Sequence, residues 1–539
     1  MTNFSVAAVF SNHMVLQQNK KIAVFGKADI NSFITVSLYD SKKSLLAANS
    51  IQSFNESWLL FLPPVSAQND CSLEITCEDQ KITYSDVAIG EVWLAGGQSN
   101  MEFELQNCTE GPEELARTNA GENVRFYYTN KIAWKDDAFY KAEKNTSWQT
   151  WDSSAKGSWS AVGYFFAKKL ASDLGCTVGI IGCNWGGTSA SAWMRREFLE
   201  KDEDLKSYLT EQEEAVKGKS IEEQIKEFDE YEIENQKWQE KYSELWKENH
   251  SITWEQAEET LGKNPWPGPR SCKNPYRPTG LYDCMLSRII PYSLKGILWY
   301  QGESDDHKPG MYYKLFSSLI ENWRCDWKDL TLPFIFVQLP VHRYKADKDF
   351  KHWCLIREAQ AKTAAMIKNT WLTSAFDLGE FNDIHPKAKK ALALRMELNA
   401  AANIYKIIPR SLAAAPIFKD ALFIHKNKEP GSALLYFENA EEGFEIREDK
   451  SRLAEYKEME ENKHTPVPEN FTGFELSGAD KIFYPAEFEL SKTDSQKNII
   501  ILHSKEVTAP CYARYGWYNY GPVTIYGKNG LPLCPFFLR

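Results

Sequence analysis

The alternation of apolar segments with helical segments between residues 89 and 408 constrains the fold of this chain more than any other feature. Strands are expected at 91–95, 177–182, 295–301, 333–339 and 370–377. Helices are expected between them at 162–174 and 353–367, and a further helix from Pro386 to about Tyr405. Strands that alternate with helices form parallel sheets covered on both faces. We therefore predict an α/β domain over residues 89–408.

Two β-rich regions flank this domain, and a charged segment interrupts it. Residues 1–88 alternate short β-rich runs with turns and predict a β-sandwich-like domain, and residues 409–539 predict a C-terminal β-rich domain. A densely charged segment at about 201–270 carries apolar residues at helical spacing and predicts a helical insertion. It is either a lid or substrate wall, or a solvated decoration. The Lys/Glu-rich segment 445–465 predicts a solvated loop or hairpin.

Charge and cysteine content exclude several classes of partner. The net charge of −11 provides no basic surplus to neutralise phosphates, so we expect no nucleic-acid partner.

No apolar run approaches the ~20 residues that span a bilayer, and the first residues lack the basic and apolar regions of a secretory signal. Eleven scattered cysteines without a Cys-x-x-Cys pair fit reduced thiols. We expect a cytoplasmic protein, and a homo-oligomer stays an open alternative.

The segment Gly97-Gln98-Ser99-Asn100-Met101 is the first candidate for chemistry. It follows the apolar run Val92 to Ala95, as a nucleophile at the end of a buried strand would. If a helix begins at Ser99, its unpaired N–H groups would face a developing oxyanion. Met101 replaces the second glycine of Gly-x-Ser-x-Gly, so this is not an α/β-hydrolase elbow. The alternative is a serine that only caps a helix.

His385 is the candidate general base, because it alone among nine histidines follows a predicted strand and precedes a predicted helix. Pro386 would be the first residue of that helix and fix the loop before it. Asp383 lies two residues earlier, within reach of the imidazole. A surface aspartate beside a capping histidine is the alternative. His307 is the rival base, but it lies in the solvated-looking run Asp305 to Lys308.

Two further turns follow predicted strands and could supply oxyanion donors. Asn184-Trp185-Gly186-Gly187-Thr188 would present backbone N–H groups without hindrance, and an ordinary tight turn is the alternative. Gln301 could donate through its side-chain amide, and Glu303 could orient a neighbour or be a satisfied buried acid. The near miss Gly187-Thr-Ser-Ala-Ser191 is interpreted as helix capping.

Taken together, these motifs resemble the sialate O-acetylesterase family of SGNH-type hydrolases. The resemblance covers almost the full length of the chain and rests on Met14–Gln17, Gly90–Met101, Asn184–Thr188, Trp299–Ser304, Asp377–Gly379, Asp383–Pro386, Arg514–Trp517 and Gly530–Pro532. It implies a flavodoxin-like core flanked by β-rich domains, and cleavage of acetyl esters of sugars without a metal or other cofactor. O-acetylated sialic acid is the first substrate that it implies.

The resemblance also implies a role for each candidate residue. Ser99 matches the nucleophile, His385 the base and Asp383 its acid partner, and the Ser99 N–H, Gly187 and Gln301 match the oxyanion region. Substrate contacts are expected from Trp185, Glu303 and Arg195, with Arg277 as a second candidate for a sialate carboxylate and a structural role open for both arginines.

Two departures from the family pattern bear on these roles. Asn382 holds the position three residues before the histidine where many SGNH hydrolases have the acid, and Leu281-Tyr-Asp-Cys-Met-Leu286 replaces Leu-Tyr-Asn-Gly-Met-Ile. Acetylated xylan or mannan oligosaccharides are the alternative substrates. A non-catalytic glycan-binding protein is the alternative function.

Overall fold

The computed structural model describes residues 3–249, 252, 254–345, 347–425, 430–460, 466–491, 493 and 496–539, with the backbone alone at 254 and 255. The chain divides into two compact units. The first comprises Met1–Glu102, Leu115–Ile297 and Lys314–Leu332, and the second Phe103–Glu114, Leu298–Tyr313 and Pro333–Arg539. Within the described ranges, no helix is both long and apolar enough to cross a bilayer.

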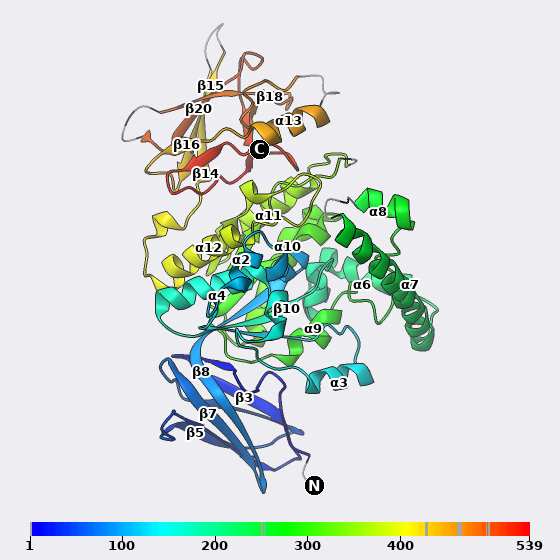
Figure 1. The fold of residues 1–539 in the computed structure, drawn as a ribbon. Coiled ribbons are helices and arrows are strands. Elements are labelled where there is room, and N and C mark those ends of the chain that lie inside the picture. The colour runs from blue at the N-terminus through cyan, green and yellow to red at the C-terminus, as the bar shows by residue number, and fades with distance from the viewer. Residues whose placement is uncertain are drawn as a thin grey trace. The chain divides into compact units, whose positions relative to one another are not determined.

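The first unit is organised around one long strand, β8 (Gln80–Gly97), which Figure 1 shows running from the N-terminal strands into the α/β region. Its first half pairs antiparallel with β7 (Gln68–Cys77), and its second half pairs parallel with β10 (Val178–Asn184). The sheet is therefore mixed. The boundary predicted at residue 88 falls inside this strand, and the division into three domains stays a prediction.

The other strands of the first unit extend these two arrangements. β4 (Phe33–Tyr39) pairs antiparallel with β7 and with β5 (Leu45–Gln52). β9 (Val124–Tyr128) pairs parallel with β10, and β2 (Val15–Gln17) pairs parallel with β8. A separate three-stranded antiparallel sheet contains β1 (Ser5–Val6), β3 (Ile22–Lys27) and β6 (Ser57–Leu62).

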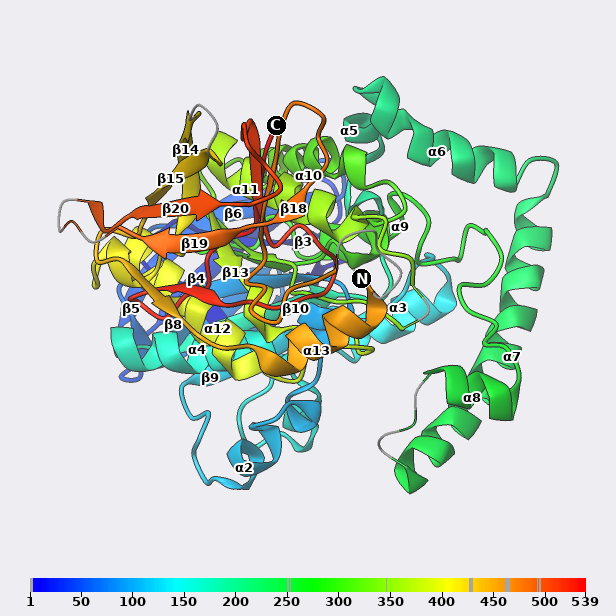
Figure 2. The same ribbon diagram turned by 90° about the horizontal axis from the view of Figure 1, so that it is seen from above.

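Four helices of the first unit begin after polar residues whose side chains cap them: α3 (Asp137–Lys144), α4 (Ala161–Leu174), α6 (Glu203–Ala215) and α7 (Ile221–Glu248). α4 begins after Ser160, whose hydroxyl accepts from the N–H of Gly163, and it ends at Gly175. The predicted insertion forms α6, α7 and α8 (Trp254–Leu261), which follow one another in Figure 2. Ser220 and Glu223 form a capping box at the start of α7. The remaining helices are α5 (Arg196–Glu200), α9 (Gly280–Cys284) and α10 (Tyr312–Asp326), and α10 begins in the second unit.

The second unit combines parallel strands with the C-terminal antiparallel sheets. β11 (Gly296–Tyr300) enters it from the first unit, and β12 (Phe334–Gln338) pairs parallel with β13 (Thr370–Ser374). α2 (Gly111–Ala116) begins in this unit, which also contains α11 (His352–Met366) and α12 (Lys389–Asn399). The strands and α11 lie within a few residues of their predicted positions.

The C-terminal region is β-rich, as predicted, and contains β14 (Ile417–Ile424), β15 (Ser432–Glu438), β16 (Phe444–Ile446), β17 (Phe474–Ser477), β18 (Tyr484–Pro485), β19 (Glu487–Leu490), β20 (Ile499–His503), β21 (Tyr512–Tyr515), β22 (Ile525–Gly527) and β23 (Phe536–Leu538). Its apolar core also takes in Val341 and Phe376 from the loops after β12 and β13.

Two local predictions are wrong. Part of the segment 445–465 forms a helix, α13 (Lys450–Met459), because Tyr456 is buried and anchors one helical face, while residues 461–465 lie outside the described residues. Pro386 does not begin α12, which starts at Lys389. The backbone of Lys387 is held outside the helix, since its N–H donates to the Glu380 carboxylate (2.8 Å) and its carbonyl accepts from Thr109 (3.1 Å).

Candidate active site

Ser99 lies at the point where β8 ends and a short helix, α1 (Ser99–Glu102), begins. The carbonyl of Gln98 accepts hydrogen bonds from the N–H groups of Met101 (2.9 Å) and Glu102 (3.0 Å), which closes the turn immediately after the strand. Ser99 is half-buried, whereas Asn100 and Met101 are fully buried. The expected sequence of strand, turn and helix start is therefore present, with the serine at its accessible point.

The Gly186–Gly187 turn packs directly against Ser99. The N–H of Trp185 donates to the carbonyl of Gly97 (3.1 Å), which joins the ends of β10 and β8. A Cβ atom at Gly186 would lie 3.2 Å from the Cβ of Ser99, so only glycine fits there without displacing the serine. The structure thus brings together Ser99, Trp185 and Gly187 from the predicted set.

Glu102 distinguishes the two glycines of this turn. Its Oε2 accepts the N–H of Gly186 at 2.8 Å, and its Oε1 forms an ion pair with Lys131. Because Gly186 already donates to a carboxylate, the N–H of Gly187 is the better candidate for an oxyanion donor. Gly187 has φ of 75°, a left-handed conformation that orients this peptide and that other residues adopt only with strain.

Two aromatic rings cover Gly187 from the outside. A Cβ at Gly187 would lie 3.0 Å from Cε1 of Tyr276 and 3.2 Å from Cζ2 of Trp266. The indole N–H of Trp266 donates to the Tyr276 hydroxyl at 2.8 Å, and the rings meet edge to face. Burial raises the pKa of Tyr276, so its hydroxyl stays protonated at neutral pH. We call Trp266 and Tyr276 the aromatic wall.

The two candidate carboxylate-binding arginines both have partners in the first unit. The Nε of Arg195 lies 3.1 Å from a carboxylate oxygen of the largely buried Asp326. The Nε of Arg277 donates to the carbonyl of Cys272 at 2.7 Å. A sialate carboxylate would have to compete with these contacts. The substrate role of Arg195 stays a prediction.

His385 and Asp383 lie in one loop of the second unit. Oδ1 of Asp383 accepts the backbone N–H of His385 at 2.8 Å, so this carboxylate shapes the loop around the histidine. Asn382 has φ of 61°, and its side chain accepts the N–H of Lys345 at 3.2 Å. Asparagine tolerates this left-handed conformation well, which gives it a structural use where many relatives have the acid.

A buried lysine, Lys389, lies near this loop, and the sequence did not reveal it. Lys389 is 1% exposed, and its ammonium lies 4.8 Å from the ring centre of Phe103. The ring centres of Phe103 and His385 are 6.3 Å apart. Burial lowers the pKa of Lys389 to about 7, against the attraction of Glu303, Asp383 and Glu380. A lysine at the first residue of a helix carries no sequence signal of burial, because lysines are usually solvated.

His342 is a second residue that the sequence did not single out. It follows β12 and is 4% exposed, with its ring packed against those of Tyr344 and Trp353. Burial lowers its pKa to about 4, so it is neutral at physiological pH. His342 also follows a predicted strand, 333–339, and precedes a predicted helix, 353–367, so it shares the position on which the prediction of His385 rests.

Gln301 and Glu303 lie just after β11 in the second unit, and both are buried. The amide of Gln301 donates to Asp305 Oδ2 at 2.7 Å, and its oxygen accepts from the Tyr312 hydroxyl at 2.9 Å. These bonds fix its orientation. His307 is exposed, as predicted, but Asp305 in the same run is fully buried. Within the described ranges, no three His, Cys, Asp or Glu side chains are arranged to hold a metal ion.

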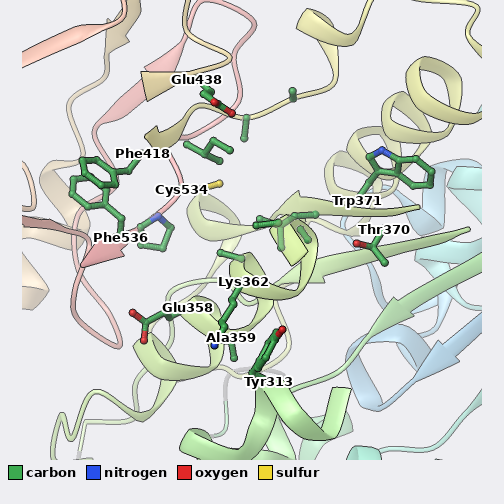
Figure 3. A pocket seen from close by; sticks show the side chains of 18 of the residues that line it. Tyr313, Glu358, Ala359, Lys362, Thr370, Trp371, Phe418, Glu438, Cys534 and Phe536 are labelled. Carbon is green, nitrogen blue, oxygen red and sulfur yellow. The ribbon is translucent and has the colours of Figure 1, made fainter. Parts of the chain in front are cut away.

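A cavity of about 970 Å³ lies elsewhere in the second unit, between α11, β13 and the C-terminal strands. Figure 3 shows Trp371, Lys362 and Phe536 among the side chains around it. The residues that line it in the described part of the chain include none of the predicted site residues. Its size therefore says nothing about the chemistry of Ser99 or His385.

Comparison with known proteins supports the resemblance seen in the motifs. A family model described as carbohydrate esterase, sialic acid-specific acetylesterase, matches residues 267–403, which contain Gln301, Asp383 and His385. Sialate O-acetylesterase from Mus musculus is 26% identical over 429 residues, covering 75% of this chain and 74% of its own. The Homo sapiens enzyme is 24% identical and covers 75% and 71%.

A solved structure extends the comparison over the whole chain. A carbohydrate acetylesterase from Xanthomonas citri is similar over 100% of both chains, with 25% sequence identity and a TM-score of 0.72. The similarity therefore includes both the N-terminal and the C-terminal β-rich regions of the chain. The chain is thus a carboxylic-ester hydrolase related to the sialate O-acetylesterase family.

Proposed function

We propose that this chain is a carbohydrate O-acetylesterase that removes acetyl esters from sugar hydroxyls, with O-acetylated sialic acid as its first substrate. The observation that carries the proposal is the half-buried Ser99, held at the end of β8 against the glycine turn of Trp185–Gly187. A hydroxyl beside unhindered backbone N–H groups is what acyl transfer requires. The family relationship supports the acetyl ester as the bond that is cleaved. We also propose that the parallel strands form a flavodoxin-like core.

The first half of the reaction forms an acetyl-enzyme. His385 removes the proton of Ser99 as the hydroxyl oxygen attacks the acetyl carbonyl carbon. Negative charge develops on the carbonyl oxygen, and the N–H groups of Ser99 and Gly187 and the amide of Gln301 are the proposed donors to it. The tetrahedral intermediate collapses when the protonated His385 donates its proton to the departing sugar oxygen.

The second half releases acetate. His385 takes a proton from water, the resulting hydroxide attacks the acetyl carbonyl, and the proton returns to Ser99 as the ester bond breaks. Asp383 is the proposed acid partner that stabilises the imidazolium. Its hydrogen bond to the His385 backbone supports a second task, which is to hold the loop conformation.

One observation favours a second class of substrate. The pairing of Arg195 with Asp326 occupies a guanidinium that a sialate carboxylate would otherwise bind. Acetylated neutral sugars, such as xylo- or manno-oligosaccharides, require no such cation. Acetate release from both classes, measured side by side, ranks them.

The decisive test is Ser99→Ala. We expect acetate release to fall at least about a thousandfold, because the nucleophile is lost while the fold is kept. Ser189→Ala is the matched control, since Ser189 lies in the near-miss motif and its hydroxyl accepts the N–H of Ser191 as a helix cap. Near wild-type activity in Ser99→Ala, or a comparable loss in Ser189→Ala, would refute the assignment.

A further inference from the structure

Trp266 combines wide exposure with a position beside the proposed oxyanion turn. Its side chain is 51% exposed, although one edge of the ring lies against Gly187. Gly186 contacts Ser99, and the next residue, Gly187, contacts Trp266. Because successive Cα atoms are about 3.8 Å apart, these two contacts lie close together. A substrate whose acetyl group reaches Ser99 therefore has its next atoms near the aromatic wall.

The indole ring is fixed in place before any substrate arrives. The backbone N–H of Trp266 donates to Oδ1 of Asn264 at 2.7 Å, and the indole N–H donates to Tyr276. Asn274 binds the same loop from the other side, because its amide donates to the carbonyl of Pro269 (2.9 Å) and its oxygen accepts the N–H of Tyr276 (2.8 Å). About half of the Trp266 surface is thus open to solvent, on a ring whose N–H is held by a hydrogen bond.

This loop is also fastened to α7 of the insertion. The hydroxyl of Ser271 donates to the carbonyl of Gln224 at 2.9 Å, and the side-chain oxygen of Gln224 accepts the N–H of Cys272 at 3.0 Å. A Cβ at Gly268 would clash with the ring of Tyr231, so the loop backbone lies flat against the helix. The end of the insertion therefore acts as a rigid support for Trp266.

An exposed, immobilised tryptophan has a physical use that a buried one lacks. The axial C–H groups of a pyranose form an apolar face that packs on an aromatic ring, and a ring already held in place loses little entropy on binding. The neighbouring phenol is protonated at neutral pH and adds a polar edge for sugar hydroxyls.

We propose that the aromatic wall is the sugar-binding subsite, and that the pyranose ring bearing the acetyl ester stacks on the exposed face of Trp266. This inference rests on the proposed function, because it takes Ser99 as the point of attack. It assigns the end of the 201–270 insertion to substrate binding, as a fixed wall. The ligand class is a sugar ring, whatever its charge.

The test compares two substrates in the full-length protein. Trp266→Ala should lower kcat/KM for 4-O-acetyl-N-acetylneuraminic acid, whose ester is on a ring carbon, and for acetylated xylo-oligosaccharides by about tenfold, mostly through KM, since stacking acts on the bound sugar. For ethyl acetate, which has no ring to stack, kcat/KM should stay within about twofold. Trp266→Phe should recover part of the sugar-ester activity.

Trp246→Ala is the matched control, because Trp246 is 42% exposed on α7 of the same insertion, and it should leave both substrates unaffected. Equal losses on ethyl acetate and on the sugar esters in Trp266→Ala would overturn the subsite. So would unchanged KM values for the sugar esters. Failure of the proposed function looks different: ethyl acetate hydrolysis would then survive in Ser99→Ala.

Discussion

The serine region of the first unit and the histidine loop of the second are surrounded by different kinds of residue. Around Ser99 the structure uses glycine backbone, strand ends and aromatic rings, with one carboxylate, Glu102, to fix the turn. Around His385 it uses buried charged groups, among them Lys389 and Glu303. The first arrangement determines where the backbone and Ser99 lie, and the second affects the protonation of the groups around His385. Substitutions should therefore act by geometry in one region and by charge in the other.

The largest effect is expected from His385→Ala. Loss of the proposed general base should lower kcat about a thousandfold or more on every acetyl ester, because proton removal from the proposed nucleophile is common to all of them. His307→Ala is the control, since His307 is the exposed rival base. Steady-state acetate release measures both variants. A larger loss in His307→Ala would reverse the assignment.

Gly187→Ala tests whether the serine region depends on backbone geometry. The new Cβ would lie 3.0 Å from Tyr276, at a residue with φ of 75°, so we expect about a hundredfold loss of kcat as the proposed oxyanion donor shifts. Gly218→Ala is the matched control, because Gly218 has φ of 82° and open space around its Cβ position. Both variants should lose about 1 kcal/mol of stability from backbone strain. Unchanged kcat in Gly187→Ala would remove it from the oxyanion site.

Asp383 separates the geometric from the electrostatic contribution within the histidine loop. Asp383→Asn keeps an oxygen to accept the His385 N–H but loses the charge, whereas Asp383→Ala loses both. We expect a smaller loss of kcat in Asp383→Asn than in Asp383→Ala, because only the second variant also loses the hydrogen bond that shapes the loop. Equal losses in the two variants would show that the charge alone matters.

The smallest effect is expected in the pH dependence of stability. The pKa of Lys389 is about 7 when folded, below its ordinary value of 10.5, so the unfolded chain binds more protons between these values and the free energy of unfolding rises with pH there. Lys389→Met removes this dependence. The Tm of the variant relative to wild type should rise as the pH falls from 9 to 7 and then level off.

Lys387→Met, at an exposed lysine of the same loop, provides the control for that measurement. Its Tm difference from wild type should be the same at pH 6, 7.5 and 9. A difference for Lys389→Met that is also constant over this range would mean that Lys389 is not the group that titrates.

Strands, helices and turns could be predicted from the sequence because hydrophobic periodicity and turn residues are local signals. Burial and contacts between distant segments could not, because tertiary packing determines them. The strand that ends before Ser99 and the helical insertion were predictable because apolar runs and charged helical stretches are local signals. The start of α12 was not, because Lys387 makes its backbone contacts with Glu380 and Thr109, which are distant or unmarked in the sequence. The burial of Lys389 and the position of Trp266 beside Gly187 depend on segments far apart along the chain, and no local pattern reports them.

The continuity of β8 has a consequence for how this protein can be cut or recombined. A fragment that begins at residue 89 would keep Ser99 but lose β2, whose residues pair with Ala88 to Gly90, and Gln17, whose side chain accepts the N–H of Val92 at 2.9 Å. Ile89 and Gly90 would lose their β2 partners, and the N–H of Val92 would lose its acceptor. The N-terminal strands are therefore not an exchangeable module. Gene fusions or truncations that preserve this hydrolase should respect the whole strand from Gln80 to Gly97.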